Sequence, residues 1–231
     1  MLLRVSCSTH YGHVLFRLLP CSCPTAVLSN SVSRAYVTSS DQSASSVDAG
    51  EVDRFNKLSG EWLGEDNAFK ALHSLNRLRI PWIVENLRKS KTPITPDLGA
   101  VRIVDVGCGG GLVAVPLARL GAEIYGIDAS ADGVSSAKLS VEKAFKYSDT
   151  KPKTHFSFTS VERFAEQHIE EFDAVVASEV VEHVLSLNDF VSSCVRLLRK
   201  DGLLFFTTIN RTLLSRIVAI WLAEVRIFYA T

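Results

Sequence analysis

Five short apolar segments recur along the central part of the chain: VRIVDVG, AEIYGID, HFSFTS, FDAVVAS and LLFFTTI. The segments between them carry apolar residues at helical spacing. Short buried strands that alternate with helices are typical of right-handed βαβ units. The pattern predicts an α/β fold, in which helices cover both faces of a parallel sheet.

The same pattern divides the rest of the chain. Residues 41–50 are small and polar, which indicates a linker. Residues 51–97 have helical spacing interrupted at Pro81, and we expect them to form a helical lid before the core at 98–212. Residues 213–231 are apolar with interspersed arginines. They fit either a helix that packs over the sheet or a helix that lies on a membrane surface.

Residues 1–40 differ in composition from the rest. They are rich in serine, threonine and leucine and contain three arginines but no carboxylate. This composition is typical of a mitochondrial transit peptide, which we expect to be disordered; a tail without a targeting role is the alternative. The triplet Arg34-Ala35-Tyr36 resembles a matrix-processing site and predicts cleavage near Val37.

Charge and cysteine content exclude some classes of protein. Basic and acidic residues number 25 each, so no net field favours nucleic acid, and we expect no nucleic-acid partner. Outside residues 1–40 the cysteines are Cys108 and Cys194, too few for a disulfide framework. No uncharged run approaches the roughly 20 apolar residues of a membrane-spanning helix.

The candidate cofactor site is the glycine-rich turn after the first apolar segment, VDVGCGGGL. Glycines let the backbone approach a ligand closely, and the next helix offers free N–H groups. A dinucleotide fingerprint needs its third glycine where Leu112 stands, whereas Gly111 follows Gly109 by only two positions. The tighter turn, with Asp105 before it and Gly107 at its start, favours a cofactor that carries an amino acid instead of a pyrophosphate.

Further candidates follow the next two strands. Asp128 ends the second strand, where a carboxylate can accept hydrogen bonds from both hydroxyls of a ribose. Its alternative role is to cap the following helix, which Ser130 could do instead. Ser160 and Val161 follow the third strand, where an adenine would lie. These positions predict a cofactor with an adenosine part.

Residues 51–224 resemble the ubiquinone-biosynthesis O-methyltransferases, which are class I enzymes that use S-adenosylmethionine. The resemblance rests on the segments EVDRFNKLSGEW, FKALHSLNRLRIPWI, DVGCGGGL, FDAVVASEVVEHV and FFTTINRT. It implies a Rossmann-like class I methyltransferase sheet of seven strands, the last of them reversed. Because the resemblance ends near Val225, we expect the last two strands to be missing. The strand LLFFTTI would then be an exposed apolar edge.

The resemblance also implies roles for individual residues in cofactor binding. It assigns Arg79 to the methionine carboxylate, Gly107 to a backbone contact, Asp128 to the ribose and Ser178 to the methionine end. A guanidinium can hold a carboxylate through two hydrogen bonds. Taken alone, however, an arginine on a helix is more often a solvated charge.

Glu179, Glu182 and His183 are the candidates for metal binding, Glu182 and His183 also for catalysis, and the resemblance assigns all three to a magnesium ion. If this stretch is helical, the three share one face. Magnesium prefers oxygen ligands to imidazole, so the residue types alone support the ion weakly. A cation would orient adjacent phenolic oxygens of an acceptor. Alternatively, His183 acts as a general base without a metal.

The resemblance implies methyl transfer from S-adenosylmethionine to a hydroxyl of a polyprenylated catechol, in the mitochondrial matrix. It further implies peripheral contact with the inner membrane and a complex with other ubiquinone-biosynthesis proteins. A different hypothesis is a non-catalytic component that keeps its S-adenosylmethionine or partner contacts within such a complex. Both hypotheses use the same cofactor site, so the sequence does not separate them.

Overall fold

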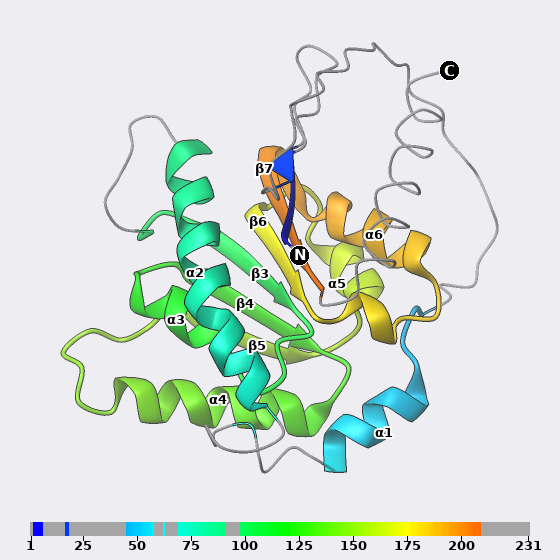
Figure 1. The fold of residues 1–231 in the computed structure, drawn as a ribbon, viewed down its shortest axis with the longest axis horizontal. Helices are drawn as coiled ribbons and strands as arrows, with labels where there is room; N and C mark the ends of the chain where they lie inside the picture. The colour runs from blue at the N-terminus through cyan, green and yellow to red at the C-terminus, as the bar shows by residue number, and fades with distance from the viewer. Residues whose placement is uncertain are drawn as a thin grey trace.

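The computed structural model describes residues 2–6, 17–18, 45–57, 62, 69–90 and 98–208. Its centre is a parallel sheet of five strands with helices on both faces, as the alternating pattern predicts (Figure 1). In chain order the parallel strands are β3 (Arg102–Val106), β4 (Glu123–Asp128), β5 (Thr154–Phe158), β6 (Phe172–Ser178) and β7 (Leu198–Thr207).

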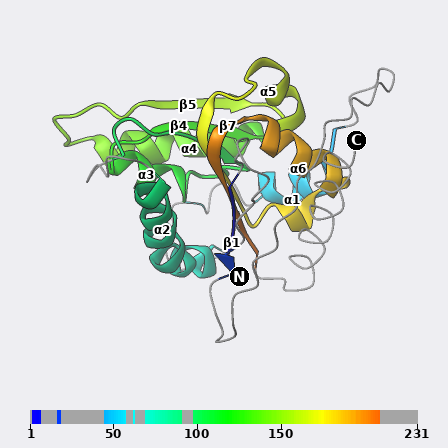
Figure 2. The same cartoon turned by 90° about the horizontal axis from the view of Figure 1, so that it is seen from above.

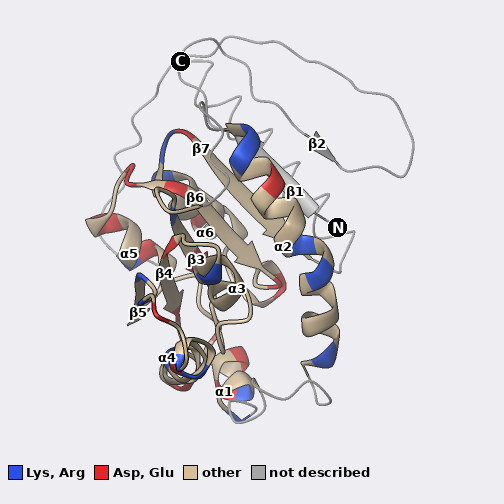
Figure 3. Ribbon diagram, turned by 90° about the vertical axis from the view of Figure 1, so that its left-hand side faces the viewer, with Lys and Arg blue, Asp and Glu red and all other residues tan. Residues whose placement is uncertain are grey.

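The described helices precede or connect these strands. Figure 2 shows α2 and α3 on one side of β7 and α6 on the other. Figure 3 shows most charged residues on the helices and loops, whereas the sheet is largely uncharged between its two ends. The helical elements are α1 (Ala49–Lys57), α2 (Lys70–Ser90), α3 (Ala114–Arg119), α4 (Ala131–Phe145), α5 (Val161–Gln167), the 3-10 turn η2 (Val181–His183) and α6 (Leu187–Arg196).

Successive residues of the strands pack into two separate apolar cores, one on each face of the sheet. On β3, Val104 packs in one cluster with residues of α5 and α6, whereas Ile103 packs in a second cluster with residues of α2 and α3. The pleat causes this division, because neighbouring side chains of a strand point to opposite faces. A strand buried on both faces must be apolar throughout, which explains the near-continuous apolar run of β6.

The winding of the sheet reverses beside β3. From β3 the chain moves outward through β4 to β5 and then returns to the other side of β3, where β6 and β7 follow. The loops after β3 and β6 therefore lead away in opposite directions. In such sheets the crevice at the carboxyl ends of these two strands is the usual ligand site.

Two short strands extend the sheet beyond β7. β1 (Leu2–Ser6) pairs antiparallel with residues 203–207, and β2 (Arg17–Leu18) pairs antiparallel with β1. The expectation that LLFFTTI is an exposed edge is therefore wrong. The strands also differ from the disorder expected within residues 1–40, whereas the transit peptide itself stays a prediction.

Some local expectations are corrected. Pro81 does not break α2, which continues through it. Asp201 and Gly202, residue types that favour turns, lie within β7, whose pairing with β6 shifts register near its start. The apolar segment 213–231 lies outside the described residues. None of the described helices is long and apolar enough to cross a membrane.

Candidate functional site

A cavity of about 750 Å³ opens at the carboxyl ends of β3, β4 and β6, where the winding predicts a ligand site. Gly111 does not line it, although it helps to form the glycine turn. The other predicted site residues all line the cavity: Arg79, Asp105, Gly107, Gly109, Asp128, Ser160, Val161, Ser178, Glu179, Glu182 and His183.

The glycine turn has the backbone conformation that only glycine adopts readily. Gly107, Gly109 and Gly111 have φ angles of 68°, 47° and 83°. A side chain on Gly109 would also overlap the ring of Trp62, which stacks on Phe69 with ring centroids 3.8 Å apart. The absence of side chains in this turn therefore has two consequences: the backbone is accessible to a ligand, and the ring of Trp62 has room to pack against it.

Asp128 holds the glycine turn from the end of β4. Its two carboxylate oxygens accept hydrogen bonds from the N–H groups of Gly109 and Ser130, both at 2.7 Å. Ser130 is the cap of α4, since its hydroxyl accepts a hydrogen bond from the N–H of Gly133 at 2.8 Å. The alternative that Asp128 caps this helix is wrong. Burial raises the pKa of the Asp128 carboxyl, and the backbone hydrogen bonds oppose this shift.

Arg79 is buried in the wall of the cavity, with only 2% of its surface exposed. Its Nη1 donates to the Ser178 hydroxyl, and its Nε donates to Oδ1 of Asn76 at 2.5 Å. The alternative of a solvated helix charge is therefore wrong. Burial lowers the pKa of the guanidinium, and the carboxylates of Asp105 and Glu179 counteract this effect.

Asp105 is the buried carboxylate at the end of β3. Its Oδ2 has no hydrogen-bond partner in the described part of the chain. Burial raises the pKa of this carboxyl to about 7, although Arg79 lowers it. A buried carboxyl with a pKa near 7 beside a buried guanidinium is the arrangement expected where a polar or charged ligand completes the site.

The raised pKa of Asp105 predicts a pH-dependent stability. In the unfolded chain this carboxyl loses its proton near 3.8, but in the folded chain it does so near 7. Between these values the folded state binds more protons, so this group makes the fold less stable as the pH rises. Asp105→Asn removes the effect. The measurement is the free energy of unfolding in urea without ligand, for the Asn variant minus the wild type. This difference should be more favourable to the variant at pH 8 than at pH 5, by at least about 1 kcal/mol. Equal differences at the two pH values would contradict this.

The segment after β6 is not the helix that the metal prediction required. Glu179 has a φ of 56°, and only Val181–His183 form a 3-10 turn. His183 instead turns its Nδ1 toward Oε2 of Glu51, at 2.6 Å, while Oε1 of Glu182 accepts a hydrogen bond from Thr208. Among the described residues, no group of three His, Cys, Asp or Glu side chains could hold a metal ion.

Ser160 and Val161 lie at the start of α5, whereas Arg79 is on α2. The Ser160 hydroxyl caps this helix by accepting the N–H of Arg163 at 3.4 Å. Val161 belongs to the apolar core below the sheet. Both residues line the cavity, and their contact with an adenine stays a prediction.

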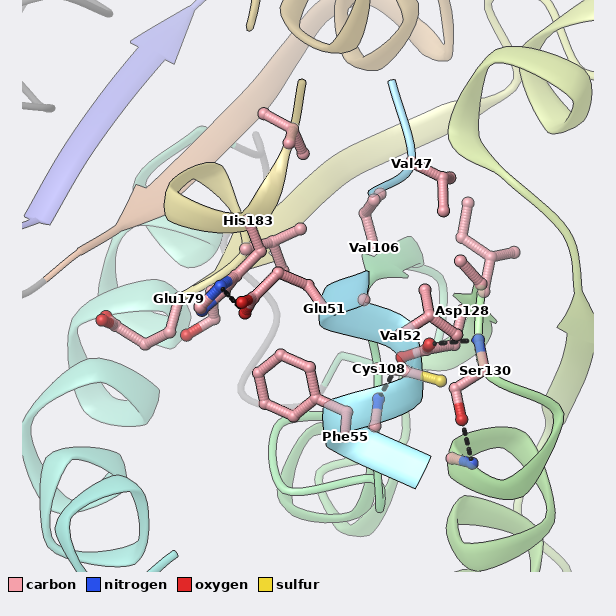
Figure 4. A pocket seen from close by; sticks show the side chains of 18 of the residues that line it. Val47, Glu51, Val52, Phe55, Val106, Cys108, Asp128, Ser130, Glu179 and His183 are labelled. Carbon is pink, nitrogen blue, oxygen red and sulfur yellow. Dashed lines mark hydrogen bonds and ion pairs between the residues drawn. The ribbon is translucent and has the colours of Figure 1, made fainter. Parts of the chain in front are cut away.

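Helix α1 supplies lining residues that the sequence did not indicate as functional. Glu51, Val52 and Phe55 line the cavity, and Figure 4 shows Glu51 and His183 pointing toward one another from two separate elements. The ring of Phe55 meets His183 edge to face, with centroids 5.1 Å apart. The available signals for Glu51, Val52 and Phe55 were their helical spacing and their place in the segment EVDRFNKLSGEW, and neither reveals the face that meets a ligand.

Comparison with known proteins agrees with this arrangement. The model of a methyltransferase domain family matches residues 104–206. The mitochondrial ubiquinone biosynthesis O-methyltransferase of Homo sapiens is 43% identical over 79% of this chain and 49% of that protein. The ubiquinone biosynthesis O-methyltransferase of Pelagibacter ubique is 36% identical over 78% of this chain and 72% of that protein, and that of Mesorhizobium japonicum is 39% identical over 78% and 71%.

The chain belongs to the ubiquinone biosynthesis O-methyltransferase family. It spans about half the length of the human relative and about 70% of the bacterial ones. The matched domain runs from β3 to β7, so it contains the glycine turn, Asp128 and the segment with His183. Glu51, Phe55 and Arg79 lie before it, on α1 and α2. The cavity thus combines residues of the shared domain with residues of the preceding helices.

Proposed function

We propose that this protein transfers a methyl group from S-adenosylmethionine to a catechol-type hydroxyl of a polyprenylated ubiquinone precursor. One observation carries the proposal: a single cavity connects the glycine turn and Asp128 with His183. A cofactor and an acceptor can therefore meet inside one cavity, as transfer between them requires. Membership of the family supports the choice of reaction and substrate class.

The residues of the cavity fit S-adenosylmethionine. Its methionine part carries an ammonium and a carboxylate, and the buried wall offers the Asp105 carboxylate and the Arg79 guanidinium. The unpartnered Oδ2 of Asp105 supports this assignment, because a ligand ammonium would satisfy it. Ser178 would contact the same end through its hydroxyl. Asp128 would accept hydrogen bonds from the ribose hydroxyls with its remaining lone pairs.

The protein's own part in the reaction is to orient the acceptor and to receive its proton. When bound, S-adenosylmethionine supplies a methyl group already activated on a sulfonium. His183 ends the turn that begins at Val180, whose side chain packs against Gly107, and His183 and Gly107 line the same cavity. Its Nδ1 is directed at Glu51, which leaves Nε2 for the acceptor hydroxyl. Accepting the hydroxyl proton there would make the oxygen a better nucleophile.

The described residues do not assemble the magnesium site that the resemblance implies. One observation is in favour of an ion: Oε2 of Glu182 is buried without a hydrogen-bond partner in the described structure. Against the proposed set, His183 faces Glu51, and Glu179 does not share a helical face with Glu182. We therefore assign no step of the reaction to a cation.

The acceptor end of the cavity suits an aromatic, apolar substrate. Val52 and Phe55 of α1 line it, together with Val184 and Phe190 on the side of η2 and α6. Contact with the inner membrane and with other ubiquinone-biosynthesis proteins belongs to the same proposal. A mitochondrial location agrees with the composition of residues 1–40 and with the mitochondrial human relative.

The proposal is tested by calorimetry with S-adenosylmethionine and by methyl transfer to 3,4-dihydroxybenzoate, a soluble catechol, using the full chain. We expect saturable binding and a mono-methylated product. Binding without product would reject the enzyme in favour of the non-catalytic component, and absence of binding would reject both the enzyme and a component that keeps its S-adenosylmethionine contacts. The same assay with EDTA decides the role of magnesium: unchanged turnover would reject a metal-dependent reaction.

A further inference from the structure

His183 is held from two sides by one helix. Oε2 of Glu51 lies 2.6 Å from Nδ1, and the Phe55 ring meets the imidazole at an interplanar angle of 85° with centroids 5.1 Å apart. Glu51 and Phe55 are four residues apart on α1, so they lie on the same face of the helix. Oε2 of Glu51 is buried and has no aligned hydrogen bond among the described residues, and Nδ1 of His183, at 2.6 Å, is the group placed to satisfy it (Figure 4).

Helix α1 is itself anchored near both ends of the cavity. Before the helix, the carbonyl of Ser46 accepts the N–H of Leu185 at 2.8 Å, and Val47 forms a β-bridge with Val184. Toward its other end, Oδ1 of Asn56 accepts a hydrogen bond from the hydroxyl of Ser130 at 2.5 Å. Ser130 is the cap of α4 and lies next to the predicted ribose position. These contacts fix α1 relative to the turn that carries His183 and relative to the glycine turn.

Glu51 has one further neighbour, the guanidinium of Arg54, at a longer distance. Arg54 lies 3.6 Å from Oε1, with 70% of its side chain exposed, so solvent screens this pair. The pair with His183 is shorter and half-buried on both sides. Because Arg54 reaches the other carboxylate oxygen, Oε2 stays directed at the imidazole.

We propose that Glu51 is a positioning residue for His183: it accepts the Nδ1 hydrogen and thereby turns Nε2 toward the acceptor hydroxyl. A carboxylate that receives one ring N–H fixes both the tautomer and the orientation of an imidazole. Phe55 forms the adjacent wall and keeps the ring from tilting away. This role rests on the proposed methyl transfer, and it assigns part of the acceptor site to the helices that precede the matched domain.

The test compares Glu51→Ala with Asp53→Ala in the full chain. Asp53 is exposed on the same helix and does not line the cavity, so its variant removes the same charge without touching His183. We expect Glu51→Ala to lower kcat for 3,4-dihydroxybenzoate roughly 10- to 100-fold, while KM and the calorimetric Kd for S-adenosylmethionine change less than about threefold. Asp53→Ala should match the wild type.

Glu51→Gln separates positioning from a general effect of charge. Its amide oxygen can still accept the Nδ1 hydrogen, so it should recover much of the kcat lost in Glu51→Ala. A Glu51→Ala variant with unchanged kcat, or one that loses S-adenosylmethionine binding and kcat to the same extent, would overturn the proposal. So would a Gln variant no better than Ala.

A second readout does not depend on turnover. In ¹⁵N-histidine NMR spectra, His183 of the wild type should show the tautomer with its proton on Nδ1, and Glu51→Ala should shift it toward the Nε2 form; His183→Gln identifies the signal. Unchanged His183 signals in Glu51→Ala would overturn the positioning role. If the wild type transfers no methyl group, the proposed reaction fails, but the spectra still decide whether Glu51 orients His183.

Discussion

Arg79→Met is expected to weaken the binding of S-adenosylmethionine about 100-fold or more and to destabilise the fold. The guanidinium is buried, and its removal leaves the buried Asp105 carboxylate without its neighbouring positive charge. Without the guanidinium the Asp105 carboxyl favours its protonated form. The hydrogen bonds from Arg79 to Ser178 and Asn76 are lost as well, and each buried partner left unsatisfied costs about 1–3 kcal/mol. The ligand's carboxylate would also lose a charge-assisted partner, which is typically worth about 2 kcal/mol or more.

Calorimetry with S-adenosylmethionine and urea unfolding without it measure these two effects separately. Arg77→Met is the matched control, since Arg77 lies exposed on the same helix and does not line the cavity. Arg79→Lys keeps the charge but loses the planar fork, so we expect most of the stability but only part of the affinity to return. An Arg79→Met variant that binds as tightly as Arg77→Met would show that Arg79 does not contact the ligand.

The sequence predicted the core of the fold because its signals there are local. The five apolar runs and the helical spacing between them need no information about distant residues, and the positions of β3 to β7 followed from them. The glycine turn and Asp128 were found in the same way, since both stand at fixed places after a strand. The sheet then brings these places together through its winding.

The remaining features depend on contacts between segments far apart in the sequence. Whether Arg79 is buried depends on Ser178 and Asp105, which come from two other elements. The stretch after Glu179 is not the helix that a shared face for the metal candidates needs, because it is rich in valines, which disfavour helix, and because Val181 is buried in the core. The contact between His183 and Glu51 also joins distant segments. The sequence predicted a helical lid that includes Glu51, but not which face of this helix meets the cavity.

Gly107→Ala should reduce the free energy of unfolding by about 2–5 kcal/mol, for two separable reasons. At a φ of 68° a side chain costs roughly 1–2 kcal/mol. In addition, the new methyl group would overlap the side chain of Val180 at the start of the turn that carries His183. Overpacking of this kind typically costs about 1–3 kcal/mol. The substitution should therefore also displace His183 from its position at the acceptor end.

Two further variants divide this cost when all are compared by urea unfolding. Gly111→Ala has the same backbone strain, with a φ of 83°, but its new methyl group would meet Ala137 and Val115 at ordinary distances of 3.4 to 3.5 Å. It should lose only the strain component. The double variant Gly107→Ala/Val180→Ala relieves the overlap, so its loss relative to Val180→Ala alone should approach that of Gly111→Ala. If the double variant instead showed the full cost of Gly107→Ala, the contact between the glycine turn and Val180 would not be the cause.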